Sequence, residues 1–141
     1  MTMIRVDLYI KECDWTIHAF FAVSEYWVED IMDALWLVGC DADTAKRAYS
    51  NLSSGELNNG ICYSNYNRKE SIIVIAKTSS AGEFLNSIVH ELSHLQGHIC
   101  DVYSLPMNGE DIAYIMGDVA LELYPHIKHL LCDCCRRKTR D

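Results

Sequence analysis

The sequence predicts a single α+β domain of 141 residues. Three observations carry this prediction. Apolar and polar side chains alternate near the N-terminus, which is typical of a half-buried strand. Residues 72–75 are four consecutive β-branched side chains, which indicates a strand covered on both faces. Two long stretches in the second half carry apolar side chains at helical spacing, so a small, mostly antiparallel sheet is expected to pack against these two helices.

Two strands and two helices are expected in the first half of the chain. The alternating segment, residues 4–10, is the first strand, and residues 16–23 are rich in β-branched and aromatic side chains and should pair with it. Residues 25–37 place apolar side chains on one face and acids on the other, which predicts an amphipathic helix ending near Gly39. A second, short helix is expected over residues 43–52.

A β-hairpin should open the second half. The turn sequence Asn58-Asn59-Gly60 precedes two strand-like segments, residues 61–66 and 71–77.

Two helices complete the expected fold. Ser80 and Glu83 form an S-x-x-E capping box, which predicts a helix start. A stripe of apolar residues then follows and should bury one face of this helix: Phe84, Leu85, Ile88, Val89, Leu92 and Leu95. After a loop another helix begins near Glu110, and it should bend or break at Pro125.

The most informative motif lies inside the first of these helices. The sequence His90-Glu91-Leu92-Ser93-His94 reads H-E-x-x-H. Histidines four residues apart lie on the same side of a helix, about 6 Å apart along its axis, so both imidazoles can bind one zinc ion. Glu91 stands beside them and can hold a water molecule. The motif therefore predicts a zinc site with His90 and His94 as ligands and Glu91 as a general base.

A catalytic zinc ion needs a third protein ligand and one open position. We expect Glu110 to be this ligand, because the loop after the motif lets the next helix pack back and a carboxylate on a helix has fixed geometry. The alternatives are Cys100, which follows Gly97 at H-E-x-x-H-x-x-G-x-x-H spacing, and three further side chains: His98, Asp101 and Asp111. A first-turn glutamate favoured by the helix dipole would also explain Glu110.

H-E-x-x-H followed by the helical string Glu110-Asp111-Ile112-Ala113 resembles the zincin-like metallopeptidases that use glutamate as third zinc ligand. Among these glutamate zincins, the chain is most similar to the small metallopeptidases of phages and mobile elements, including those that cleave repressors. The resemblance covers about residues 71–125. It implies a minimal zincin-like domain, a Zn²⁺ cofactor and a peptide or protein substrate. It also implies that the second strand of the hairpin borders the cleft and receives an extended peptide as an added strand. The loop is shorter than in the repressor-cleaving enzymes, and no Asn follows Ala113.

These residues predict a zinc-dependent hydrolase, most simply a peptidase. Glu91 would take a proton from the attacking water and pass it to the leaving amine. Tyr114 lies one turn after Glu110 and is expected to contribute to the reaction or to support that ligand. The candidate donors to the developing oxyanion are Tyr103, Tyr114, His98 and His126. The alternative is a non-catalytic, zinc-stabilised binding protein, in which closed coordination replaces the open position.

Composition and charge limit the possible partners and location of the protein and the state of its cysteines. The net charge is −8 and no basic stripe is present, so nucleic acid is not expected as a partner. No signal peptide or bilayer-spanning apolar run is visible, which predicts a cytoplasmic protein without a membrane partner. The seven cysteines are odd in number and irregularly spaced, so reduced thiols are expected. The cluster from Cys132 to Cys135 is either a soft-metal site or a reactive tail.

Overall fold

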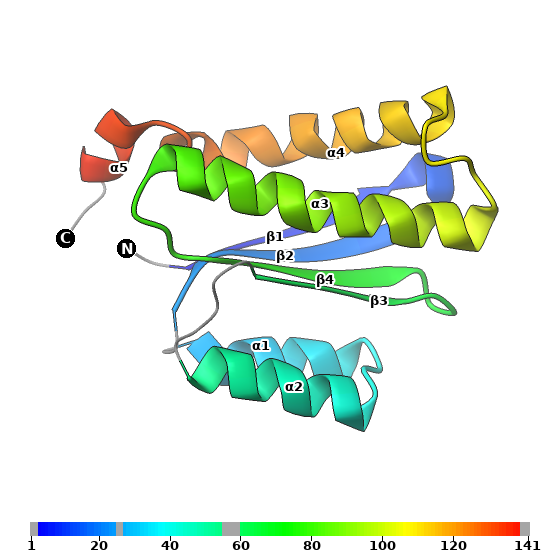
Figure 1. Ribbon diagram of the computed structural model, residues 1–141, viewed down its shortest axis with the longest axis horizontal. Coiled ribbons are helices and arrows are strands. Elements are labelled where there is room, and N and C mark those ends of the chain that lie inside the picture. Colours follow the sequence, from blue (N-terminus) through cyan, green and yellow to red (C-terminus); the bar gives the residue numbers. More distant parts are fainter. Residues whose placement is uncertain (1–2, 25–26, 55–59, 139–141) are drawn as a thin grey trace.

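The α+β prediction is confirmed by the computed structural model, which describes residues 3–24, 27–54 and 60–138. A four-stranded mixed sheet lies between two helical layers (Figure 1). Helices α3 (Ala81–Tyr103) and α4 (Glu110–Ile127) cover one face of the sheet. Helices α1 (Val28–Leu37) and α2 (Ala42–Ser53) cover the other. No described helix is both long and apolar enough to cross a membrane.

The strand order is β1-β2-β4-β3, with β1 over Ile4–Ile10, β2 over Trp15–Val23, β3 over Ile61–Asn65 and β4 over Glu70–Ala76. β1 pairs antiparallel with β2, and β3 pairs antiparallel with β4, as the sequence predicts. β2 and β4 pair in parallel. β4 therefore has a neighbour on each side and cannot receive an added strand. Among the described residues the free edge near α3 belongs to β3, which corrects the expectation placed on residues 71–77.

Each face of the sheet carries its own apolar core. Ile73 and Ile75 of β4 pack toward α3 and α4, whereas Ile72 and Val74 pack toward α1 and α2. All four side chains are almost fully buried, which confirms that this strand is covered on both faces. Successive side chains of a strand point to opposite faces, so one continuous apolar run serves both cores.

The start of α3 is capped by side chains. Ser80 Oγ accepts a hydrogen bond of 3.1 Å from the backbone N–H of Glu83, as the capping box predicts. The carboxylate of Glu83 bonds to Ser79 rather than to Ser80. Asp133, from the short helix α5 (Asp133–Lys138), accepts a bond of 2.8 Å from the N–H of Ala81. The beginning of the H-E-x-x-H helix is therefore held from two sides.

Two predictions about the long helices need correction. Leu85 and Val89 of the expected apolar stripe are 52% and 57% exposed, because the buried stripe of α3 runs through Phe84, Ile88 and Leu95 instead. α4 does not break at Pro125 and continues to Ile127 before the 3-10 turn η3 (Lys128–Leu130). Pro125 is exposed on its last turn. The N-terminal part of the first predicted helix (25–26) and most of the turn before β3 (55–59) lie outside the described residues.

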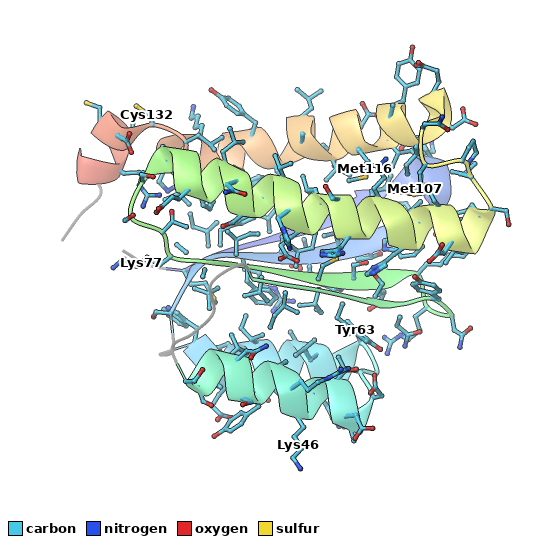
Figure 2. The ribbon with its side chains drawn as sticks, in the orientation of Figure 1. Lys46, Tyr63, Lys77, Met107, Met116 and Cys132 are labelled. Carbon is cyan, nitrogen blue, oxygen red and sulfur yellow. The ribbon has the colours of Figure 1, made fainter. Side chains whose placement is uncertain are left out.

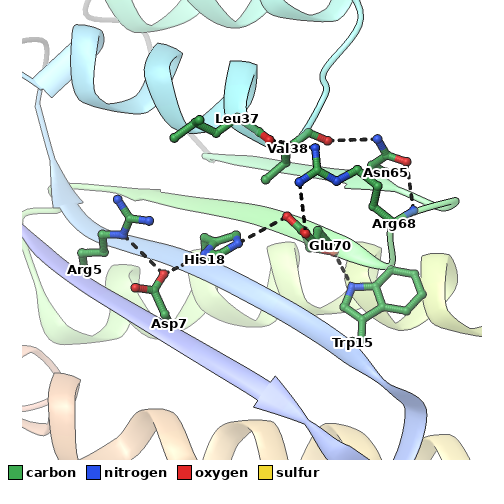
Figure 3. A network of polar contacts seen from close by, with 10 residues as sticks. Arg5, Asp7, Trp15, His18, Leu37, Val38, Asn65, Arg68 and Glu70 are labelled. Atoms are coloured by element: carbon green, nitrogen blue, oxygen red, sulfur yellow. Dashed lines mark hydrogen bonds and ion pairs between the residues drawn. The ribbon is translucent and has the colours of Figure 1, made fainter.

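A network of hydrogen bonds and ion pairs connects β1, β2 and β4 (Figure 3). His18 Nδ1 lies 2.7 Å from Asp7, and its Nε2 lies 3.6 Å from the carboxylate of Glu70. Arg68 contacts Glu70 at 3.3 Å and donates a hydrogen bond of 2.8 Å to the carbonyl of Leu37, at the end of α1. These contacts fix the β3–β4 turn against the α1 layer, and thereby fix the position of the edge strand.

Candidate metal and catalytic site

The three candidate site residues of H-E-x-x-H lie on a helix, as predicted, near the middle of α3. The imidazole rings of His90 and His94 stand 5.1 Å apart between centroids, and both side chains are exposed. Glu91 points into the molecule and is only 3% exposed, with Oε1 3.9 Å from His90 Nε2. Helical spacing therefore produces two adjacent imidazoles at the surface and one buried carboxylate next to them.

The flank of α3 that carries this group faces the edge strand β3. His98 contacts Ser64 of β3, and the hydroxyl of Tyr66, just beyond β3, donates a bond of 3.0 Å to Asp101. At 100° per residue, positions 90, 94 and 101 of a helix lie within about 40° of one another. The two histidines therefore share the β3 flank of α3 with Asp101.

The opposite flank of α3 faces α4 and β1. Gln96 donates a hydrogen bond of 3.0 Å to the carbonyl of Met107, in the loop that leads to α4. Tyr103 donates from its hydroxyl to the carbonyl of Cys13, at the end of the turn η1 (Lys11–Cys13) that follows β1. The chain thus leaves α3 on this side, and α4 extends over β1 and the same apolar core (Figure 1).

Glu110 begins α4 and is exposed, and the structure does not bring it together with His90 and His94. Within residues 3–24, 27–54 and 60–138, no three His, Cys, Asp or Glu side chains form a group that could hold a metal ion. Two of the three expected ligands are therefore assembled, with the general base beside them. The third donor is not supplied by the packing of α4.

The other side chains that the sequence analysis assigned to the site also lie apart from the two histidines or are already engaged elsewhere. Tyr114 is 71% exposed on α4 and lines a cavity of about 410 Å³ together with Asp111. This cavity lies between α4 and the turn after β1, away from the histidines. Cys100 is buried in the core beneath α3, and Asp101 is bonded to Tyr66. Neither alternative donor is placed beside His94.

Two residues that the sequence analysis did not assign to the site, Gly60 and Cys62, lie near Glu91. Gly60 has a φ of +97°, and a Cβ atom there would overlap the carbonyl oxygen of Val74 and lie 3.4 Å from Glu91 Cγ. Cys62 of β3 faces α3, and its Sγ lies 4.0 Å from His98 Nδ1. Its neighbour Tyr63 instead packs toward α1 and α2 (Figure 2). Strand alternation therefore gives the α3 side of β3 a row of small residues that ends in Ser64.

Burial changes the acid–base properties of this group. Removal from water raises the pKa of Glu91 to about 7, because a charged carboxylate is poorly solvated there. Burial, and then the charge of Glu91, raise the pKa of the Cys62 thiol to about 12, so the thiol is neutral. Burial, followed by His94, lowers the pKa of His98, whereas Asp101 acts in the opposite direction. A carboxylate that exchanges its proton near neutral pH suits general-base chemistry.

Of the four candidate oxyanion donors, only His98 shares the β3 flank with the motif. The hydroxyl of Tyr103 is used by the carbonyl of Cys13, and Tyr114 and His126 belong to α4. His98 instead ends a row of hydrogen bonds with Ser64 and Ser71. A helical spacing of four from His94 was the only sequence signal for this placement.

Comparisons with models of known protein families, with curated proteins and with solved structures found no match for this chain. The fold and the side-chain geometry are therefore the basis of the functional argument.

Proposed function

We propose that this protein is a zinc-dependent hydrolase, most simply a peptidase, with Glu91 as its general base. The observation that carries the proposal is the position of Glu91, a nearly fully buried carboxylate whose only described ionic neighbour is His90. Burying a carboxylate whose one described ionic neighbour lies 3.9 Å away opposes folding, so a structural role does not account for it. A base beside two exposed imidazoles does account for it.

Zinc is supported in part by the donor set. His90 and His94 would hold the ion through two neighbouring imidazoles on one helix face, which is a preferred zinc arrangement. When bound, zinc polarises a substrate carbonyl and lowers the pKa of water toward neutrality. The third donor is not assembled by the described residues, and the exposed position of Glu110 on α4 gives that residue no geometric support.

Glu91 would serve as acceptor and then as donor of a proton. Its pKa of about 7 lets it take a proton from water and return it to a leaving amine at neutral pH. Gly60 keeps the chain close above the carboxylate, since a side chain at this position would displace the backbone from Val74. The small residue thus helps to exclude water on the β3 side of the base.

A peptide is the substrate class that the edge strand favours. β3 is paired with β4 on one side only, and α3 presents Glu91 and His98 toward it. An extended peptide could add to the free edge through backbone hydrogen bonds and bring a carbonyl to the site. We also propose a cytoplasmic location, supported by seven cysteines that are all free thiols.

Metal analysis combined with cleavage of fluorescein-labelled casein tests the proposal. Wild-type protein should bind one zinc ion and cleave casein, and His94→Ala should lose both properties. Glu91→Gln should retain the zinc and lose at least about 100-fold in kcat, the typical contribution of a general base. The matched control is Glu122→Gln, an exposed glutamate on α4, which should behave as wild type.

The result that would refute the hydrolase is full cleavage activity in Glu91→Gln, or a wild type that binds no zinc. Stoichiometric zinc without hydrolysis would instead support the zinc-stabilised binding protein. X-ray absorption on the zinc-loaded protein would then count the protein ligands, because a structural site has four and a catalytic site keeps one open position.

A further inference from the structure

A row of four side chains connects the centre of the sheet to α3. The indole Nε1 of Trp15 donates a hydrogen bond of 2.7 Å to Ser71 Oγ, seen in Figure 3 as the dashed line that leaves Trp15. Ser71 Oγ lies 2.6 Å from Ser64 Oγ, and Ser64 Oγ lies 2.6 Å from His98 Nδ1. The row therefore begins on β2, crosses β4 and β3, and ends on the helix of the H-E-x-x-H motif.

The direction of these hydrogen bonds follows from the number of protons. An indole N–H can only donate, so Ser71 Oγ accepts at this end. Ser71 is fully buried, and its hydroxyl proton has one described acceptor, Ser64 Oγ. The proton of Ser64 then has one described acceptor, His98 Nδ1. In every other arrangement the proton of the fully buried Ser71 or of the half-buried Ser64 lacks a partner among the described residues, which costs free energy.

This direction fixes the tautomer of His98. A neutral imidazole has one donor and one acceptor nitrogen, so an accepting Nδ1 places the ring proton on Nε2. In the ring, Nε2 lies opposite the side that contacts Ser64. None of the described residues accepts a hydrogen bond from it. His98 is half-buried, one helical turn beyond His94 on the β3 flank.

We propose that His98 is a substrate-binding donor of this site, held with its proton on Nε2 so that it donates to a carbonyl oxygen of a peptide. Trp15, Ser71 and Ser64 are the positioning residues that hold it in this state. The inference rests on the proposed function for its substrate, although the tautomer stands independently. It separates the role of His98 from that of the two histidines expected to bind metal, which must leave a ring nitrogen unprotonated.

The ligand that fits is a neutral carbonyl that gains negative charge during reaction. A fixed N–H donor stabilises such an oxygen more as its charge develops, and it needs no rearrangement when it is already oriented. The row from Trp15 provides this orientation because Ser71 donates its hydroxyl proton to Ser64, and Ser64 donates its own to His98. Amide bonds of an extended peptide on β3 supply this type of oxygen.

The first test determines the tautomer without any substrate. Two-bond ¹H–¹⁵N correlation spectra of the metal-free protein, with His98 assigned through the His98→Gln variant, should show a protonated Nε2 and an accepting Nδ1. Ser64→Ala should remove the shift that hydrogen bonding gives to Nδ1. Ser93→Ala, an exposed serine of α3 that bonds only to the carbonyl of Val89, is the control and should leave the spectrum unchanged. A proton on Nδ1 in the wild type would overturn the proposal.

The second test measures casein cleavage and zinc content together. His98→Phe should retain zinc and lose about 100-fold in kcat, and His98→Gln, which keeps an N–H donor, should recover part of it. Ser64→Ala should lose on the order of 10-fold, as expected for a positioning residue. Loss of zinc in His98→Phe, or unchanged kcat, would refute the role of donor. A wild type without hydrolysis would refute the proposed function and the substrate role, while the spectra would still decide the tautomer.

Discussion

Replacement of Glu91 by glutamine should make the metal-free protein more stable, and the gain should grow with pH. The reason is that burial raises the pKa of Glu91 from 4.5 to about 7. The folded protein therefore holds this proton more tightly than the unfolded chain does. As pH rises from about 4.5 to 7, the folded protein must release a proton that the unfolded chain has already lost, so stability falls. Above pH 7 the full penalty is present.

The magnitude follows from the two pKa values. The rise from 4.5 to about 7 corresponds to roughly 3 kcal/mol, since one pKa unit is about 1.4 kcal/mol. Between pH 5 and pH 8 the linkage relation gives a loss of roughly 2–3 kcal/mol for the wild type. Glutamine at position 91 has no such titration. Its own cost of burying an amide does not depend on pH, so it cancels when the two pH values are compared.

The assay is urea unfolding followed by tryptophan fluorescence and circular dichroism at pH 5 and pH 8, with a chelator present. The stability of Glu91→Gln relative to wild type should increase by roughly 2–3 kcal/mol between these pH values, or about 5–10 °C in melting temperature for a chain of this size. Glu122→Gln, the exposed control, should show no such increase. An equal difference between Glu91→Gln and wild type at both pH values would refute the raised pKa of this buried carboxylate.

Three further predictions concern the surroundings of the site. Gly60→Ala should lower the free energy of unfolding by at least about 2 kcal/mol in urea titrations, because the added Cβ meets Val74 at a φ of +97°; an unchanged midpoint would contradict this close approach. Ser80→Ala should cost about 1 kcal/mol in the same assay through loss of the α3 cap, with Ser93→Ala nearly neutral. Glu110→Gln should bind zinc as tightly as wild type in calorimetric titration, because α4 lies on the other flank of α3; a tenfold weaker affinity would restore Glu110 as a ligand.

The parts of the fold that depend on local periodicity could be predicted from the sequence. Alternation in residues 4–10 and the apolar run at 72–75 gave the correct strands, and the antiparallel pairings followed from short connections. The spacing of His90 and His94 gave their adjacency, since four residues nearly complete one helical turn. Ser80 gave the start of α3 because capping is decided within four residues.

The composition of the candidate site depends on which helices and strands contact one another, and no local sequence pattern encodes these contacts. The expectation for Glu110 assumed that the helix after the motif returns on the histidine side. Gln96 and Tyr103 instead hold the end of α3 toward α4 and β1, so α4 occupies the opposite flank. Ser64 and Ser71 are single small polar residues on two strands, and only the register of β3 with β4 places them opposite each other. Their contact with His98 requires a helix from a third part of the chain.

The distribution of polarity on α3 differs from that of ordinary helix packing in the way that the proposed site requires. Toward the core and α4, this helix buries Leu95 and Ile99 at no electrostatic cost. Toward β3 it buries Glu91, a side chain that an apolar residue of similar volume would replace with a gain in stability, and it partly buries His98. Both polar side chains lie on the flank that carries the exposed imidazoles and the free strand edge. If α3 only had to pack on its sheet, an apolar residue at position 91 would make the protein more stable. The unfolding experiment therefore measures the stability cost of Glu91, and the hydrolysis experiment measures the activity that this cost would support.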